Sequence, residues 1–212
     1  FESFPGDRIQ AALESPESRI ERKPRLLDGY GVALLESGEE PNRRAVTLNY
    51  SGILGHRQQD NLVLELFSRG LEMLPDLGYP ALWEYVQRWD ANSMTHNTVT
   101  VDETQPVRGI GGVCRLFGSA GGVHAVSASH DPYPPETTKL GSPDSRMTDL
   151  YERTVVLVDV DPDRFYVVDL FAVNGGRQHD QSWHGMLRPV DSPQLDWKGQ
   201  ASGTLAGPDV EQ

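Results

Sequence analysis

The sequence predicts a mainly β protein, an antiparallel β-sandwich with little helix, and three observations support this. Short apolar stretches alternate with closely spaced turn residues from Arg25 onward, which is typical of sandwich strands. Helix signals are sparse, and no internal repeat or heptad pattern is present. With 37% hydrophobic and 24% charged residues, the 212-residue chain has the composition of a folded domain rather than of a disordered tail or a fibre.

The apolar stretches are the expected strands. In chain order they read GYGVALLE, RAVTLNY, NLVLELF, NTVTVD, GGVCRLFG, GGVHAVSAS, RTVVLVDVD and RFYVVDLFAV. Between residues 60 and 67 both faces of the alternating pattern are largely apolar, which predicts a central strand. Asp161, Pro162 and Asp163 separate the last two stretches, so these are predicted to pair as a hairpin.

The remaining segments carry weaker signals. Residues 11–22 have a helix-forming composition that Pro16 interrupts, and residues 81–89 are long enough for two helical turns. The segment 131–149 is rich in Pro, Ser and Thr, which predicts a long surface loop. Residues 191–212 lose the apolar periodicity and are interpreted as a linker or a truncated strand region.

The charge balance and the cysteine content argue against several classes of function and site. The 19 basic residues stand against 31 acidic ones, and the net charge of −12 argues against general attraction to nucleic acid or to an anionic membrane. Cys114 is the single cysteine, which excludes intrachain disulfides and CxxC-type metal sites. No run of eighteen or more apolar residues is present, so we expect no membrane insertion.

One row of polar residues precedes the predicted central strand. His56, Gln58 and Asp60 alternate in GHRQQDNLVLELF, so their side chains share a face if the strand begins early. Such a row can hold a metal ion, or a histidine that a carboxylate orients.

Two further candidates follow in the chain. Asp76 lies in the predicted turn LPDLGYP, where a short carboxylate has a fixed direction. His96 opens the predicted strand THNTVTVD on a polar face, while Val99 and Val101 are expected to enter the core. Each of these residues alone would be an ordinary structural residue, and only their joint order makes them candidates.

These motifs, with RTVVLVDVDPDRFYVVDLFAVNGG and HDQSWHG after them, resemble the heparinase II/III-like polysaccharide lyases, which cleave heparin, heparan sulfate or alginate. The resemblance covers roughly Leu26 to Gly185, and HNTVTVD followed by Gln105 is its most specific part. Members of this family join an N-terminal α/α-toroid to C-terminal antiparallel sandwich sheets, and the active site lies in the cleft between them.

The resemblance implies a domain organisation and partners. Residues 1–25 would be a linker or the end of a preceding helical domain, and residues 26–190 a heparinase II/III-like, supersandwich-like β-sandwich that is incomplete in this chain. Residues 191–212 would follow as the linker or truncated strand region. The implied partners are an acidic polysaccharide substrate and the α/α-toroid domain of the same parent protein. The implied compartment is periplasmic or extracellular.

The resemblance also implies roles for individual residues. His56 would be the catalytic histidine of the cleft, Asp76 and His96 would bind a divalent metal ion, zinc in the family, and Asp60 would orient its neighbours. Gln58 stands where the family has another metal-binding histidine. Because an amide oxygen is a poorer zinc ligand than imidazole, we expect the site to be empty or to hold a harder ion than zinc.

The implied reaction is β-elimination on a uronate polymer. It removes the C5 proton beside a carboxylate, which requires groups that neutralise that carboxylate while the enolate forms. Another group takes the proton, and a further one protonates the departing O4. His56 could supply one such group. The family tyrosine comes from the toroid and no tyrosine here matches its motif, so we expect this chain alone to be inactive or nearly so.

Two alternatives from other classes remain open. In a noncatalytic carbohydrate-binding sandwich, Trp83 and Trp89 would form a sugar platform together with tyrosines, and the histidines would be structural. Saturable sugar binding that His56→Ala leaves unchanged would favour it. In the other alternative the chain is a structural module that packs beside a helical partner. A large exposed apolar patch would support that possibility.

Overall fold

The computed structural model describes residues 5–15, 22–52, 60–76, 91–106, 111–131, 148–185 and 194. This part of the chain is mainly β, as predicted. Its strands are β1 (Arg25–Leu27), β2 (Val32–Ser37), β3 (Arg44–Asn49), β4 (Val63–Ser68), β5 (Leu71–Leu74), β6 (Val99–Val101), β7 (Val113–Ala120), β8 (Val123–Ser129), β9 (Thr148–Asp159), β10 (Phe165–Gly175) and β11 (His179–Gln181). Its helices are α1 (Gly6–Glu14) and the 3₁₀ helix η4 (Ser93–Thr95).

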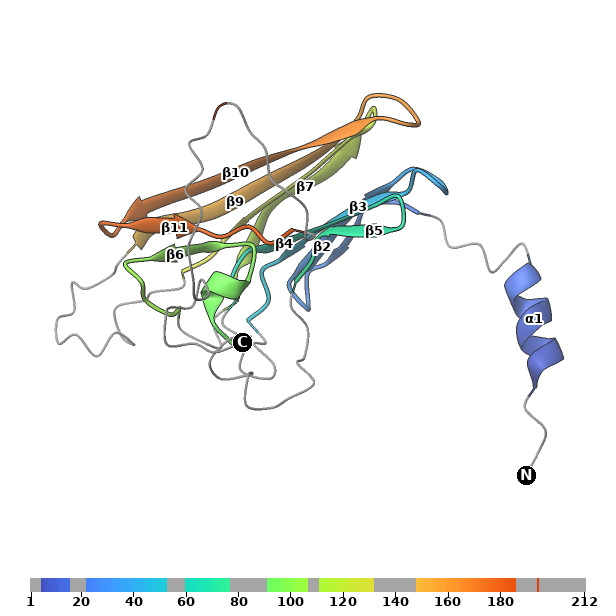
Figure 1. Cartoon of the computed structure of the whole chain (residues 1–212), viewed down its shortest axis with the longest axis horizontal. Coiled ribbons are helices and arrows are strands. Elements are labelled where there is room, and N and C mark those ends of the chain that lie inside the picture. The colour runs from blue at the N-terminus through green and yellow to red at the C-terminus, as the bar shows by residue number, and fades with distance from the viewer. Residues whose placement is uncertain are drawn as a thin grey trace.

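The strands of the described residues form two main antiparallel layers and a small additional pair (Figure 1). One layer has the order β1-β2-β3-β4-β5, and the other has the order β10-β9-β8-β7. In the small pair, β11 lies antiparallel to β6. The described strands therefore form an incomplete β-sandwich, in agreement with the predicted fold class.

The hydrophobic core lies between the two layers because alternate residues of each strand point inward. Strand β3 shows the period, with Val46 and Leu48 fully buried and Thr47 between them partly exposed. Val99 and Val101 of β6 join this core, as expected from the sequence. The other buried members are Ala33, Leu35, Tyr50, Leu62, Leu64, Val126, Ala128, Tyr151, Val155 and Leu157.

The predicted hairpin is confirmed. Strands β9 and β10 pair antiparallel, with Phe165 opposite Asp159. In the turn, Oδ1 of Asp161 accepts hydrogen bonds from the backbone N–H groups of Asp163 at 2.9 Å and Arg164 at 2.8 Å. A short acidic side chain that binds the backbone ahead of it is the reason why such residues favour turns.

The predicted central strand is confirmed in position but starts later than expected. β4 lies between β3 and β5, with both faces largely covered. It begins at Val63, because Leu62 has a left-handed backbone with φ +51° that ends the extended run. Asp60 therefore precedes the strand, and the alternation used to align its side chain with earlier residues does not apply to it.

Helix α1 occupies Gly6–Glu14 and so overlaps the first part of the predicted segment 11–22, of which residues 16–21 lie outside the described residues. The residue after it, Ser15, is extended, with ψ 136°, as expected for a residue that precedes a proline. None of the residues of α1 is buried, and this helix lies apart from the sheets (Figure 1). The predicted helix at 81–89 and most of the predicted loop at 131–149 lie outside the described residues. In the described part of the chain, no helix is long and apolar enough to cross a membrane.

Candidate metal centre

His96 does not lie on a polar strand face, and this prediction is wrong. It follows the short helix η4, where the side chain of Asn92 accepts a hydrogen bond from the backbone N–H of Met94 at 3.0 Å. The backbone N–H of His96 donates to the carbonyl of Ser93 at 3.2 Å, so the turn continues up to the histidine. β6 begins only at Val99, and the His96 side chain is fully buried.

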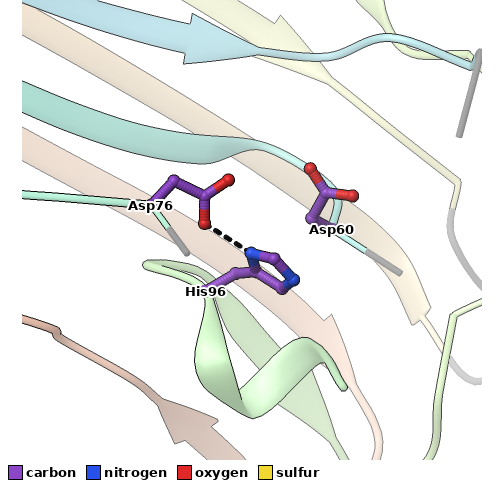
Figure 2. Close-up of side chains that lie close together, drawn as sticks. All are labelled: Asp60, Asp76 and His96. Atoms are coloured by element: carbon purple, nitrogen blue, oxygen red, sulfur yellow. Dashed lines mark hydrogen bonds and ion pairs between the residues drawn. The ribbon is translucent and has the colours of Figure 1, made fainter. Parts of the chain in front are cut away.

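Asp76 lies just after β5 and contacts the buried imidazole. Its Oδ1 is 2.5 Å from Nδ1 of His96, a distance at which the ring N–H donates to the carboxylate (Figure 2). The Asp76 side chain is 17% exposed and that of His96 is 0% exposed. This bond fixes the orientation of the ring, because a buried imidazole rotates only at the expense of its hydrogen bonds.

Asp60 completes a three-residue cluster with Asp76 and His96. One potential ligand atom of each residue lies within 4.8 Å of the corresponding atoms of the other two. Figure 2 shows the side chains coming together from three separate segments, before β4, after β5 and after η4. The family resemblance implies that Asp60 orients its neighbours, whereas its carboxylate lies where it could itself be a ligand.

The Asp60 carboxylate is buried, and its own backbone N–H is the donor that acts on it among the described residues. The residue is 6% exposed, and none of the other described residues donates a hydrogen bond to its side chain. Burial raises the pKa of Asp60 from its ordinary value of 3.8 to about 6, and the nearby Asp76 raises it further while His96 lowers it. A buried anion of this kind is stable only when a cation or hydrogen-bond donors neutralise it.

The segments that carry the three side chains are also tied together by hydrogen bonds from their neighbouring residues. Nδ2 of Asn97 donates to the carbonyl of Pro75 at 3.1 Å. Oγ1 of Thr98 donates to the carbonyl of Asn61. These bonds connect the segment after η4 to the ends of β5 and β4. These hydrogen bonds therefore limit how far the three side chains of the cluster can separate.

Asp76 also lines a cavity of about 180 Å³ next to the cluster. The wall includes Glu65 and Glu72, and burial raises the pKa of Glu65, opposed by a hydrogen bond from Thr47. Three carboxyl groups around one small cavity repel an anionic chain. A polyanionic ligand would therefore have to approach the cluster from another side.

The donor set of the cluster fits a divalent cation. Two carboxylates and one imidazole provide the hard oxygen ligands and the single nitrogen that ions such as Mn²⁺ or Zn²⁺ accept. Such an ion would also neutralise the two acidic side chains. His56 and Gln58 lie outside the described residues, so their sequence-based assignments stay predictions.

Sequence reasoning did not place Asp60 among the possible metal ligands, although one signal could have done so. An aspartate at the edge of an apolar core strand predicts a buried carboxylate that needs a counter-ion. Asp76 and His96 were expected to be candidates together. They lie 20 positions apart in sequence, and the structure brings their side chains into direct contact.

Comparison with known proteins gives concordant results. Residues 43–192 match the family model described as heparinase II/III-like, C-terminal. The fold is similar to a heparan sulfate lyase from Pedobacter heparinus, with a TM-score of 0.54 and 20% identity, over 71% of this chain and 22% of that chain. It is also similar to heparinase III, with a TM-score of 0.52 and 19% identity, over 74% of this chain and 23% of that chain. None of the curated proteins searched matches the chain.

These similarities extend over most of the present chain and over less than a quarter of the solved lyase chains. At such identities the solved structures establish the fold alone, whereas the family model covers more than two thirds of the 212 residues. The fold similarity and the family match agree. The chain belongs to the heparinase II/III-like family, of which it carries the C-terminal β-sandwich domain.

Proposed function

We propose that this chain is the β-sandwich portion of a polysaccharide lyase that cleaves a uronic-acid-containing polysaccharide, of the heparan sulfate or alginate type, by β-elimination. The observation that carries the proposal is the cluster of Asp60, Asp76 and His96, in a chain of a lyase family. Membership of the family supports the reaction class, and the solved relatives include a heparan sulfate lyase.

The three clustered side chains would hold a divalent metal ion, zinc or a harder ion. When bound, that ion would supply fixed positive charge beside the cleft. Asp76 orients the imidazole of His96, and the buried Asp60 contributes the second carboxylate. The oxygen-rich donor set favours a harder ion such as Mn²⁺ more than a site with several histidines would.

His56 would be the group of this chain that acts on the substrate. An imidazole can transfer a proton at the sugar C5 or O4, or donate a hydrogen bond that neutralises the uronate carboxylate. The solved relatives are more than four times longer than the part aligned with this chain, which supports a separate helical domain in the parent protein as the other wall of the cleft. The domain limits 1–25, 26–190 and 191–212 stay predictions.

The metal site is tested by elemental analysis of the purified chain after dialysis. We expect near-stoichiometric metal in the wild type, and loss of metal in folded Asp76→Ala and His96→Ala variants. His179→Ala is the matched control, because the exposed side chain of this histidine contacts the nearby carbonyl of Gly175 and lies outside the three-residue cluster. Absence of metal from the wild type under metal-replete conditions would refute the metal site.

The reaction is tested with the parent protein, which carries the rest of the cleft. It should release unsaturated uronate ends, followed by their ultraviolet absorbance, from heparan sulfate or alginate, and His56→Ala should abolish this release. Saturable sugar binding without cleavage, unchanged in His56→Ala, would refute the lyase assignment. It would favour the carbohydrate-binding alternative.

A further inference from the structure

Arg153 is a fully buried arginine on β9, close to the cluster but not part of it. Its Nε and Nη2 donate to the two carboxylate oxygens of Asp169 on β10, at 2.8 and 2.9 Å. The guanidinium carbon also lies 5.1 Å from the ring centre of Phe171 and 5.4 Å from that of Trp183. A bidentate carboxylate and two aromatic rings hold the planar group in one orientation.

The remaining nitrogen of this guanidinium, Nη1, binds two backbone segments at once. It donates to the carbonyl of Leu62 at 2.8 Å and to the carbonyl of Asn97 at 2.5 Å. Leu62 is two residues after Asp60, and Asn97 directly follows His96. One nitrogen atom therefore bridges two segments that each carry a candidate metal ligand, in addition to the bonds from Thr98 to Asn61 and from Leu64 to Asn97.

We infer that Arg153 is a positioning residue for the metal centre, which holds the Asp60 and His96 segments at the separation that an ion requires. The inference rests on the proposed metal site. Asp169 and the two aromatic rings orient the guanidinium independently of its bonds to the two backbone carbonyls, so it can act as a fixed point for both segments. Contacts that support metal ligands from outside the coordination sphere typically change metal affinity by about 10- to 100-fold when they are lost.

The backbone at this point needs an external contact. Leu62 has φ +51°, the left-handed region that residues with a side chain rarely adopt. The bond from Arg153 to its carbonyl is one of the contacts that keep this conformation. Lysine cannot replace the arginine, because a single ammonium group cannot bind Asp169 with two parallel bonds and also reach two carbonyls in fixed directions.

Arg44 on β3 is a matched control. It is 2% exposed, its guanidinium pairs with Asp159 at 2.7 Å, and it donates to the carbonyl of Pro162 at 2.9 Å. Its guanidinium carbon lies 5.4 Å from the ring centre of Phe165. Like Arg153, it is a buried arginine that contacts an aspartate, a backbone carbonyl and an aromatic ring. It lies, however, at the opposite end of β3 and β4 from the cluster.

The test compares Arg153→Lys and Arg44→Lys under conditions in which both variants are folded. Calorimetric titration with Mn²⁺ should show that Arg153→Lys binds the ion about 10- to 100-fold more weakly than the wild type. This is the usual loss when a group that supports a metal ligand is removed. In Arg44→Lys the affinity should change by less than about threefold, since distant sites act independently. Equal losses in the two variants, or no loss in Arg153→Lys, would overturn the inference.

A second measurement on the metal-free proteins separates this inference from the proposed metal site. Hydrogen exchange should become faster around residues 60–64 and 96–98 in Arg153→Lys, compared with Arg44→Lys at matched global stability. The amide of Leu64, which donates to the carbonyl of Asn97 at 3.3 Å, is the reporter. If the wild type binds no Mn²⁺, the metal site fails, and unchanged local exchange would still overturn the positioning role of Arg153.

Discussion

Replacing Asp60 by asparagine should stabilise the metal-free protein near neutral pH, although the change removes a candidate ligand. The carboxylate is 6% exposed and receives no hydrogen bond from another described residue. Its ionised form is therefore poorly solvated in the folded state, where burial is the main cause of its raised pKa. Asparagine has nearly the same shape and carries no charge, so it removes this cost.

The magnitude follows from the pKa of Asp60, which rises from 3.8 to about 6 on folding. Each pKa unit corresponds to about 1.4 kcal/mol, so the ionised group lowers the free energy of unfolding by about 3 kcal/mol. The folded state binds the proton more tightly than the unfolded state. Stability therefore falls as the pH rises from about 4 to about 6, and it stays low at higher pH.

Urea unfolding in the presence of a chelator, at several pH values between 4 and 8, measures this effect. We expect Asp60→Asn to exceed the wild type by up to about 3 kcal/mol at pH 8 and to match it near pH 4. Asp149→Asn, a change at an exposed aspartate on β9, controls for the loss of one negative charge. Equal stability of Asp60→Asn and the wild type at pH 8, or lower stability of the variant, would refute the reasoning.

The remaining predictions concern the core, the buried ion pair and the metal. Leu48→Ala empties a fully buried position and should lower the free energy of unfolding by about 2–5 kcal/mol, measured by urea titration. Arg44→Met leaves the carboxylate of Asp159 without its guanidinium and should cost about 3 kcal/mol in the same assay. Free Mn²⁺ at about 100 times its dissociation constant should stabilise the wild type by about 2.7 kcal/mol in thermal unfolding. Asp76→Ala and His96→Ala should gain nothing, and a gain equal to that of the wild type would contradict the ligand assignment.

The strands could be predicted from sequence because their signal is local. Apolar residues alternate along β3 and along β9 and β10, and the Asp161 turn between the last two is marked by its own residues. The sandwich class follows from many such stretches with little helix between them. The start of β4 was placed too early because the left-handed backbone at Leu62 leaves no mark in the apolar pattern.

The candidate site could be predicted only in part, because its geometry depends on contacts between distant segments. The order of the motifs identified Asp76 and His96 as joint candidates. The environment of His96 was predicted wrongly, since η4 is a single turn without periodicity and buries the ring that a strand would have exposed. Arg153 carries a clearer signal, since it shares the inward face of β9 with Val155 and Leu157. A charge at a core position of an apolar strand indicates a buried partner.

The central claim is that Asp60, Asp76 and His96 bind one divalent ion together. The most direct test is an anomalous difference map from crystals of the chain grown with Mn²⁺. We predict one strong peak at about 2.1 Å from a ligand atom of each of the three side chains, which is the bond length for oxygen and nitrogen ligands. A map without a peak at these residues, while Mn²⁺ is bound elsewhere on the chain, would contradict the account.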